Sequence, residues 1–483
     1  MYKFIDNQIQ FEDFEQPIGM NIKRENRWVK RAESIPWNEV EKRYAALFKN
    51  KKGNVAKPLR LALGACIIQA EYGYSDVEVA TMIQEHPYLQ FFCGYKKYDD
   101  SKMPFDPSVM VHFRKRLTPE ILGEINELVI QKALENTLFD DENNDKNNND
   151  DDNSNSDNDS SNSGTMIVDA TCAPSQIKFP QDTELLNEAR EFTEKIIDEL
   201  HNPADGAKPR TYRKVARKAY LNIARSKKRT VKKIRKAIRQ QLGFVNRNIH
   251  VIDKMLSCGK VICAKKLQKL STVKQLFQQQ KFMYDNGTHS VLNRIISLSQ
   301  PWLRPIVRGK AKASVEFGAK LDISVVDGWT RLEYHSFEAY NEATNLPEMI
   351  ESYKKRTGRF PERILADKIY RNRANLGYCS ARGIRLSGPA LGRPKKGEIR
   401  DKKQDYIDEA ERIEVERKFS LAKRKCGLGL IVTRLEETTC HCLAMAILLL
   451  NIRKIAKIPC EFFMVLLSWI ESFMHFRKLG IVQ

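Results

Sequence analysis

The sequence predicts an α/β (α+β) protein in which a small sheet lies among long helical segments. Apolar residues recur at helical spacing over 37–135 and again towards the C-terminus. Between these regions, β-rich runs occur at 166–168, 315–335 and 363–366. With 483 residues, 42% of them hydrophobic, the chain is long enough for two to four domains with real cores.

The N-terminal helical region is expected to consist of short helices joined by tight turns. Gly73 ends one helical pattern, and Ser75 with Glu78 forms a capping box that begins the next helix. A further helix begins at 106–108 and ends in the basic triplet 114–116. This arrangement suits a helix-turn-helix-like DNA-binding module. A helical bundle with solvated charges explains the same pattern equally well.

The charge of the chain is strongly positive. Lys and Arg outnumber Asp and Glu by 82 to 61, a net charge of +21. Residues 140–164 nevertheless contain nine acids and one Lys, and we expect them to form a disordered acidic linker. A protein this basic usually binds a polyanion, and nucleic acid is the first expectation. Binding to a ribosome or to a membrane surface is the competing explanation.

The positive charge is concentrated in 208–239, which contains fifteen Lys or Arg and no acid. Two apolar stripes at helical spacing predict a helix pair, namely Tyr212, Val215, Ala219 and Ile223, then Val231, Ile234 and Ile238. An ordinary solvated face mixes both signs of charge, so we expect this pair to contact the DNA phosphate backbone. The predicted DNA-binding residues here are Lys214, Arg217, Lys218, Lys232 and Arg235.

The cysteines and the apolar stretches predict a reduced, cytoplasmic protein without membrane partners. The ten Cys include no CxxC pair, and Cys440-His441-Cys442 is too tight to chelate one zinc ion with all three side chains. The N-terminus has no basic region followed by an apolar core, so no secretory signal is expected. The apolar stretches 443–450 and 462–470 fall short of about 20 residues and are expected to be core helices.

Two aspartates share one sequence context. Asp169 and Asp367 each follow three or four apolar residues and precede a polar loop. In an α/β sheet this context places a carboxylate at the carboxyl edge, where ligands bind. Asp327 also follows an apolar run, but the Gly after it makes it a turn former between two strands.

The third candidate acid lies on a predicted helix near the C-terminus. Arg412, Glu416 and Lys423 lie on one stripe of this helix. The adjoining apolar stripe, which would dock the helix on the sheet, consists of Val415, Phe419 and Ala422. An ordinary surface ion pair between Glu416 and Arg412 is the alternative interpretation.

Three acids of this kind predict a metal site. Two strand-end Asp and a helical Glu can cluster without a metal only if some of them are protonated. Hard oxygen ligands suit Mg²⁺ or Mn²⁺, and we expect two ions. Such a pair activates water and stabilises the leaving oxygen of a phosphodiester. We therefore expect the acids to hold the metals and the metals to hold DNA.

Four ordered blocks carry a family resemblance, from about residue 40 to about 455. They are MIVDATCAPSQIKFPQDTELLNEAR, PWLRPIVRGKAKASVEFGAK, ILADKIYRNRAN and RIEVERKFSLAKRKCGL. Together they resemble the DDE transposases of bacterial insertion sequences, in the group with an InsH-type helical N-terminal domain. The resemblance implies a ribonuclease-H-like catalytic core, with catalytic and metal-binding roles on Asp169, Asp367 and Glu416.

The family pattern around the catalytic Glu is Tyr, two residues, Arg, three residues, Glu, six residues, Lys. Arg412, Glu416 and Lys423 match it, and the two cations are expected to neutralise DNA phosphate beside the metals. The Tyr position departs from the pattern, because Glu409 stands there and Tyr406 lies one turn away. Further DNA contacts, or else ordinary loop charges, are expected at Arg371, Asn372 and Arg373.

The resemblance and the charge distribution together predict the organisation of the chain. The expected parts are a DNA-binding domain (1–139), the acidic linker (140–164), a catalytic domain (165–189 and 301–455), a basic helical insertion (190–300) and a C-terminal helix (456–483). The insertion would hold the transposon ends.

The predicted activity is cleavage and strand transfer of an insertion sequence in the bacterial cytoplasm, in association with the nucleoid. The partners would be the terminal inverted repeats, target DNA and a second copy of the chain on DNA. The alternatives are a metal-dependent nuclease without strand joining, a catalytically inactive DNA-binding protein derived from a transposase, and a structural RNA-binding protein.

Overall fold

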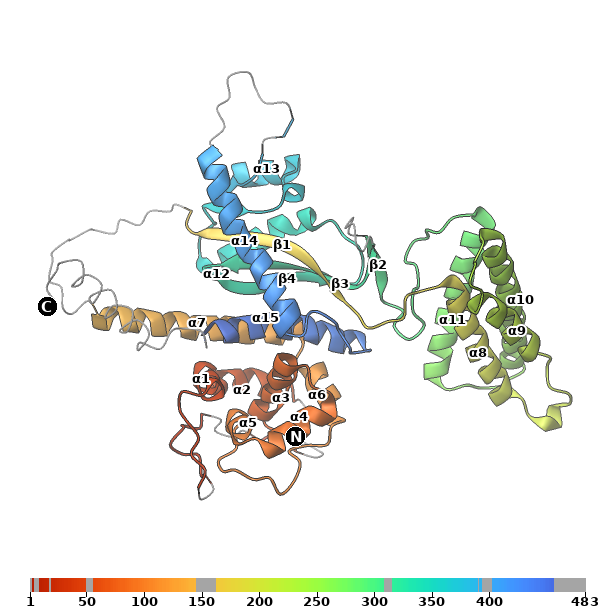
Figure 1. Cartoon of the computed structure of the whole chain (residues 1–483), viewed down its shortest axis with the longest axis horizontal. Coiled ribbons are helices and arrows are strands. Elements are labelled where there is room, and N and C mark those ends of the chain that lie inside the picture. The colour runs from red at the N-terminus through yellow and green to blue at the C-terminus, as the bar shows by residue number, and fades with distance from the viewer. Residues whose placement is uncertain are drawn as a thin grey trace, which may run out of the picture.

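The computed structural model describes residues 2–3, 8–16, 19–48, 55–144, 162–307, 315–389, 391–392 and 402–455, with the backbone alone for 137–144. Within these residues the chain combines helices with one mixed sheet, which confirms the predicted α+β class. Figure 1 shows three regions: N-terminal helices, the sheet with its covering helices, and a separate group of helices to one side.

The regular secondary structure elements described in the N-terminal region are all helices. Its helices are α1 (Arg27–Ser34), α2 (Trp37–Ala45), α3 (Leu59–Tyr72), α4 (Asp76–Glu85), α5 (Pro87–Phe92), α6 (Val109–Arg116) and α7 (Pro119–Asn144). Gly73 ends α3 in the left-handed conformation, and the capping box of Ser75 and Glu78 begins α4, as predicted. Helix α7 continues through 140–144, where the linker was expected to begin, and the remainder of that linker up to 161 lies outside the described residues.

The sheet has six strands, β1 (Thr165–Pro174), β2 (Arg304–Val307), β3 (Val315–Val326), β4 (Trp329–Ser336), β5 (Arg363–Leu365) and β6 (Arg385–Leu386). Their order is β2-β3-β1-β5-β6, and β4 pairs with β3 as well. Strands β1, β2 and β4 all pair with β3 in the antiparallel sense, whereas β5 is parallel to both β1 and β6. The sheet is therefore antiparallel on one side of β1 and parallel on the other.

The hairpin predicted at Asp327-Gly328 is confirmed. Strands β3 and β4 are joined by these two residues alone, and both have positive φ, 51° for Asp327 and 74° for Gly328. Two-residue hairpins favour this backbone geometry, and Asp-Gly adopts it at low cost. The turn accepts hydrogen bonds at its carbonyl oxygens from Lys418 and Lys454. Asp327 thus has the structural role expected of it.

Helices cover both faces of the sheet. Helices α12 (Leu346–Thr357) and α13 (Arg373–Ser380) pack on one face, where Met166 and Val168 of β1 point. Helix α14 (Lys402–Lys425) crosses the other face (Figure 1), against Ile167 of β1 and Val325 of β3. Because side chains alternate along a strand, the odd-numbered residues of β1 face α14. Short 3₁₀ helices lie at Pro203–Asp205 (η2), Glu342–Asn345 (η3) and Lys368–Tyr370 (η4).

Helix α15 (Glu436–Ile455) joins the sheet region to the N-terminal helices. It lies alongside α7 and shares one hydrophobic core with the N-terminal helices and with α14 (Figure 1). The buried carboxylate of Glu71 on α3 pairs with Arg31 of α1 and Arg453 of α15. Among the described residues α15 alone is long and apolar enough to cross a membrane, but most of it is buried inside the protein. This agrees with the core helix predicted there.

Four helices between β1 and β2 form the helical insertion, namely α8 (Asp182–Leu200), α9 (Arg213–Ala224), α10 (Val231–Ser257) and α11 (Ala264–Asn286). Their apolar residues form two clusters of their own, with no residue from the sheet. Figure 1 shows the insertion to one side of the sheet, joined to it by the segments before α8 and after α11. The predicted helix pair in 208–239 corresponds to α9 and the first part of α10.

The buried side of this helix pair differs from the predicted stripe. Val215 and Val231 are 59% and 81% exposed, whereas Ala216 and Ala237 are buried. Small alanines let the two helices approach closely, and Gln241 donates a hydrogen bond to the carbonyl oxygen of Ala216. The predicted stripe was therefore wrong at Tyr212, Val215 and Val231, which are exposed, and correct at Ile223, which is buried. The helices themselves were predicted correctly.

Candidate functional site

Asp169 lies within β1 and not at its end. The prediction ended the strand at Asp169, but the strand pairs with β3 from Ile167 to Pro174. Cys172 and Ala173, which follow Asp169 in the strand, are also buried. Pairing with β5 on the other side stops at Ile167, which lies opposite Leu365. Asp169 therefore projects towards α14 just beyond the end of β5, so it lies at the sheet edge on the parallel side only.

Asp367 lies beside Asp169. Leu365, the last residue of β5, lies opposite Ile167 of β1. Asp367 and Asp169 each lie two residues beyond this pair, so the two aspartates lie side by side. Asp367 caps η4, and its Oδ1 accepts a hydrogen bond of 2.7 Å from the backbone N–H of Lys368. The Oδ1 of Asp169 accepts a bond of the same length from the N–H of Ala170. Each carboxylate retains further acceptor capacity.

The electrostatic environment of Asp169 disfavours its charged form. Burial raises the pKa of Asp169 to about 6, and the negative charges of Asp367 and Glu342 add to the rise. The Ala170 hydrogen bond and the positive charge of Arg412 act in the opposite direction. A partly desolvated carboxylate beside a second one is the kind of pair that a divalent cation stabilises.

We expect Asp169→Asn to stabilise the metal-free protein at pH 7.5 but not below pH 4. The pKa of Asp169 is higher in the folded state, about 6, than the ordinary 3.8, so the folded state binds this proton more tightly. That advantage is complete below the ordinary pKa and is lost as the pH rises through about 6. The shift corresponds to about 3 kcal/mol at most, reduced to about 1–2 kcal/mol by partial exposure. Thermal unfolding in EDTA at both pH values tests this, and an equal gain at both contradicts it.

Glu416 lies on the outer part of α14. Its side chain is 56% exposed, and Arg412 donates a hydrogen bond of 3.2 Å to its Oε1. The buried residues that dock α14 are Asp408 and the predicted apolar stripe Val415, Phe419 and Ala422. Arg412 therefore acts on two of the three candidate acids, pairing with Glu416 and lowering the pKa of Asp169. Lys423 is half-buried one to two turns further along α14.

The fit of these residues to a metal is partial. Asp169 and Asp367 offer adjacent oxygen donors of the type that Mg²⁺ prefers. Glu416 forms an ion pair with Arg412, which was the alternative interpretation of the sequence. Across the described parts of the chain, no three His, Cys, Asp or Glu side chains lie close enough together to hold a metal ion. The structure thus brings two of the three predicted ligands together.

Two of the three predicted DNA-binding residues in the loop after Asp367 make hydrogen bonds within the protein. Arg371 donates hydrogen bonds to the carbonyl oxygens of Leu386 and Ser387. Asn372 caps α13 by accepting a 2.8 Å hydrogen bond from the N–H of Asn375. Arg373 is exposed. Of the three, Arg373 is the most exposed, and its contact with DNA stays a prediction.

The predicted cations of the helical insertion are exposed. Lys214, Arg217 and Lys218 of α9 and Lys232 and Arg235 of α10 all face solvent. The guanidinium of Arg235 lies 4.5 Å from the ring centre of Tyr284 on α11, which orients it. A groove between α9 and α10 is lined by Lys218 together with Lys233 and Lys236. The insertion therefore presents a cationic surface along two adjoining helices.

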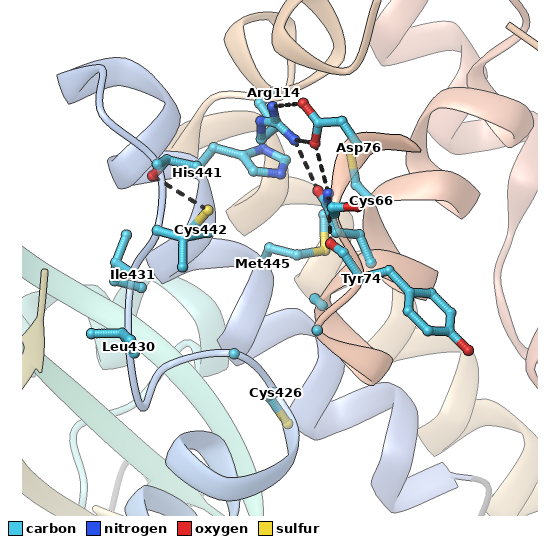
Figure 2. Close-up of a pocket in the computed structure, with 17 residues that line it drawn as sticks. Cys66, Tyr74, Asp76, Arg114, Cys426, Leu430, Ile431, His441, Cys442 and Met445 are labelled. Carbon is cyan, nitrogen blue, oxygen red and sulfur yellow. Dashed lines mark hydrogen bonds and ion pairs between the residues drawn. The ribbon is translucent and has the colours of Figure 1, made fainter. Parts of the chain in front are cut away.

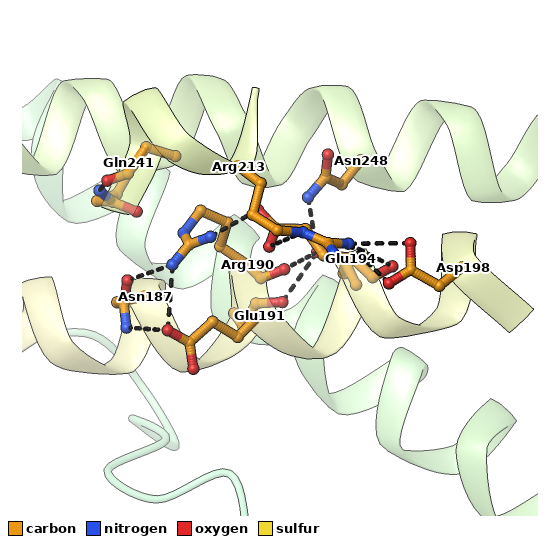
Figure 3. A network of polar contacts seen from close by, with 11 residues as sticks. Asn187, Arg190, Glu191, Glu194, Asp198, Arg213, Gln241 and Asn248 are labelled. Atoms are coloured by element: carbon orange, nitrogen blue, oxygen red, sulfur yellow. Dashed lines mark hydrogen bonds and ion pairs between the residues drawn. The ribbon is translucent and has the colours of Figure 1, made fainter. Parts of the chain in front are cut away.

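A polar network fixes α9 against α8 and so holds this surface in place (Figure 3). Buried Glu194 of α8 pairs with Arg190 at 2.6 Å and with Arg213 of α9 at 3.1 Å. Arg213 also pairs with Asp198 at 2.7 Å. Because each buried charge has an opposite partner, the network orients α9 at its first residue.

The three basic residues at the end of α6 contact other residues of the protein. Arg114 is buried and makes two 2.7 Å hydrogen bonds to Asp76 (Figure 2). Lys115 pairs with Glu437 at 2.8 Å, and the guanidinium of Arg116 lies 5.0 Å from the ring centre of Phe48. Arg114 therefore stabilises the N-terminal helices, and the DNA-binding role expected of this module stays a prediction.

The pocket in Figure 2 also explains the Cys440-His441-Cys442 triplet. It is a mainly apolar cavity of about 370 Å³ lined by α3, α15 and the loop between α14 and α15. His441 is buried, hydrogen-bonded to the carbonyl oxygen of Leu117, and burial lowers its pKa to about 4. The histidine is therefore neutral and structural, and the cysteines of the described chain are free, as predicted.

One buried acid near the site was missed by sequence reasoning. Asp322 of β3 is fully buried opposite Ala170, and its oxygens accept hydrogen bonds from Tyr340 (2.6 Å) and Asn345 (2.7 Å). Burial raises the pKa of Asp322 to about 6. An acid within the apolar run that precedes Asp327 was the available signal, because a buried carboxylate requires partners.

Two regions of the chain match known protein families. Residues 17–116 match "Transposase domain (DUF772)", and residues 364–453 match "Transposase DDE domain". The chain belongs to the DDE transposases of insertion sequences. The second transposase match contains Asp367 and Glu416, whereas Asp169 lies outside both matches.

A curated relative of this transposase is similar over a short region. It is "Uncharacterized protein ORF8 in nfe locus" of Rhizobium meliloti, 32% identical over 107 residues, or 22% of this chain and 51% of the relative. The chain thus spans about half the length of that protein. No solved structure matches the transposase.

Proposed function

We propose that this transposase catalyses metal-dependent DNA cleavage and strand transfer of an insertion sequence, and that it binds the terminal inverted repeats of the element. The observation that carries the proposal is the adjacency of Asp169 and Asp367 beyond the ends of two parallel strands, on the face crossed by α14. The matches to transposase domains support the proposed reaction class. The placement of the two aspartates supports the proposed choice of residues.

A ribonuclease-H-like core is the finer fold assignment that we propose. Three antiparallel strands, β4, β3 and β1, continue into the parallel strands β5 and β6, with helices on both faces. The three acids lie at the positions expected for such a core. Asp169 lies on β1, Asp367 follows the parallel strand β5, and Glu416 lies on α14, which crosses both strands. We assign the catalytic domain to 165–181 and 301–455, because the insertion, predicted to begin at 190, already begins with α8 at Asp182.

The metal ligands would be Asp169, Asp367 and Glu416. Two Mg²⁺ or Mn²⁺ ions, when bound, supply water activation and charge neutralisation at the phosphodiester. For Glu416 to join the aspartates it must exchange its pairing with Arg412. Arg412 is then released towards DNA phosphate, together with Lys423. Cleavage frees a 3′-hydroxyl, which attacks target DNA by in-line displacement without a covalent enzyme intermediate.

The cationic surface of α9 and α10 would hold the phosphate backbone of the element ends. Five exposed cations without an intervening acid bind a polyanion strongly and read no sequence. We assign the N-terminal helices up to 144 to end recognition and 182–300 to the basic insertion. The predicted acidic linker from 145 to 161 and the predicted C-terminal helix at 456–483 lie outside the described residues. A homodimer on DNA is proposed by analogy, since a transposase pairs two element ends.

Product analysis tests the proposed function. The purified protein is incubated with Mg²⁺, labelled DNA from the borders of its reading frame and a supercoiled target plasmid. We expect labelled ends covalently joined to the plasmid. Cleaved ends alone would indicate a nuclease without strand joining, and binding without cleavage would indicate an inactive DNA-binding protein.

A further inference from the structure

Asp367 lies just beyond the point where β5 stops pairing with its neighbours. In the part of the chain that the structure describes, β5 pairs with β1 up to Leu365 and with β6 up to Ile364. Asp169, by contrast, lies within β1 and pairs with β3. The position of Asp367 relative to Asp169 therefore depends on what holds the backbone after β5.

A serine side chain continues the β5–β6 ladder. Ser387, the residue after β6, donates its backbone N–H to the carbonyl oxygen of Ile364 at 2.9 Å. In a regular parallel ladder, the N–H of Ala366 would next donate to the carbonyl oxygen of Ser387. It donates instead to the hydroxyl Oγ of Ser387 at 3.1 Å, and both residues are buried. The hydroxyl thus replaces a backbone acceptor at the residue directly before Asp367.

The carbonyl oxygen of Ser387 has a different partner. Arg371 follows η4, and its Nη1 donates to this oxygen at 3.3 Å. Gly388 has a φ of 104°, a conformation that favours glycine, so the chain turns away from β5 directly after Ser387. The segment 366–371, which contains Asp367, is therefore tied to the end of β6 at both of its ends.

The hydrogen bond at Ala366 acts directly on the backbone that carries Asp367. A buried N–H that loses its acceptor must find another one, either by a shift of the backbone or by the entry of water. Either change moves the neighbouring carboxylate. Mg²⁺ demands near-ideal octahedral geometry, so a pair of aspartates that binds it must keep its oxygens closely placed.

We propose that Ser387 is a positioning residue for the metal site, whose hydroxyl fixes the backbone at Ala366 and so sets the separation between the carboxylates of Asp367 and Asp169. The proposal rests on the proposed function of these aspartates as metal ligands. Loss of a residue that orients a metal ligand typically weakens metal affinity about 10- to 100-fold. Ser387 touches neither metal nor DNA in this role.

Ser387→Ala tests the proposal in the full-length protein. Mn²⁺ binding without DNA is followed through the electron paramagnetic resonance signal of the free ion. We expect the variant to bind Mn²⁺ about 10-fold or more weakly than the wild type. Hydrogen–deuterium exchange over 366–371 should be faster, because the backbone there has lost a bond. Ser387→Thr retains the hydroxyl and should match the wild type in both measurements.

Ser34→Ala is the matched control. Ser34 of α1 is similarly buried, and its Oγ donates a hydrogen bond of 2.9 Å to the carbonyl oxygen of Arg31. Each alanine variant loses one buried hydrogen bond of a serine hydroxyl, so the Tm in EDTA should fall by a similar amount in both. The Mn²⁺ affinity of Ser34→Ala and its exchange over 366–371 should equal those of the wild type.

The outcomes separate this inference from the proposed function. Wild-type Mn²⁺ affinity in Ser387→Ala, or unchanged exchange over 366–371, would overturn the inference alone, provided that Asp367→Ala abolishes binding. An equal loss of affinity in both alanine variants would assign the effect to general destabilisation and would overturn the inference as well, as would a Ser387→Thr variant as weak as Ser387→Ala. A wild-type protein that binds no Mn²⁺, or an Asp367→Ala variant that binds it normally, would overturn both the inference and the proposed metal site.

Discussion

Strand transfer is expected to fall by about 10³-fold or more in each of Asp169→Ala, Asp367→Ala and Glu416→Gln. A loss of that size corresponds to about 4 kcal/mol of barrier, which is reasonable for removing a carboxylate that holds the catalytic cations. DNA binding should persist in all three variants, because the cationic surface lies on the helical insertion. Quantitative gels of joined product, with a parallel filter-binding measurement, test both parts of the expectation.

Glu414→Gln is the control on the same helix. Its carboxylate lies 3.7 Å from the ammonium group of Lys418, near the β3–β4 turn and away from Arg412. A partly exposed pair with a 3.7 Å separation contributes little to stability, about 0–1 kcal/mol, so activity should remain close to that of the wild type. Strand transfer that survives in any one of the three variants would reject that residue as a catalytic ligand.

Removing the five insertion cations together should weaken binding to element-end DNA by about 10²- to 10³-fold at 0.1 M salt. The variant carries alanine at Lys214, Arg217, Lys218, Lys232 and Arg235. Each phosphate contact contributes about 0.9 to the slope of log affinity against log salt concentration. If all five cations contact phosphate, the slope should become shallower by about 4–5. Fluorescence anisotropy at several salt concentrations measures both quantities.

The matched control removes exposed lysines elsewhere on the insertion. Lys254 and Lys265 lie near the end of α10 and the start of α11, outside the concentrated basic segment. Their double alanine variant should retain most of its affinity and nearly the full salt slope. An unchanged slope in the five-alanine variant would place the DNA on another surface of the protein.

Local backbone chemistry made several elements predictable. The Asp327-Gly328 turn and the capping box of Ser75 and Glu78 form as expected, because each depends on residues that are close in sequence. The helix pair in 208–239 was also predictable from its spacing. Its buried side was predictable only in part, because Ile223 is buried as expected whereas Ala216 is buried in place of the exposed Val215.

Features that depend on distant residues could not be predicted. The continuation of β1 past Asp169 depends on pairing with β3, more than a hundred residues away in sequence. The hydrogen bonds from Arg371 to the carbonyl oxygens of Leu386, in β6, and of the next residue, Ser387, depend in the same way on tertiary structure. The pairing of Glu416 with Arg412 was foreseen as an alternative, since it needs only helical spacing.

The location of Mn²⁺ in crystals of the protein bound to element-end DNA tests the central claim most directly. Anomalous scattering should place manganese between the carboxylates of Asp169 and Asp367, with Glu416 turned from Arg412 to complete the ligand set. Manganese held by other side chains, or a Glu416 still paired with Arg412 while the metal is bound, would contradict the account.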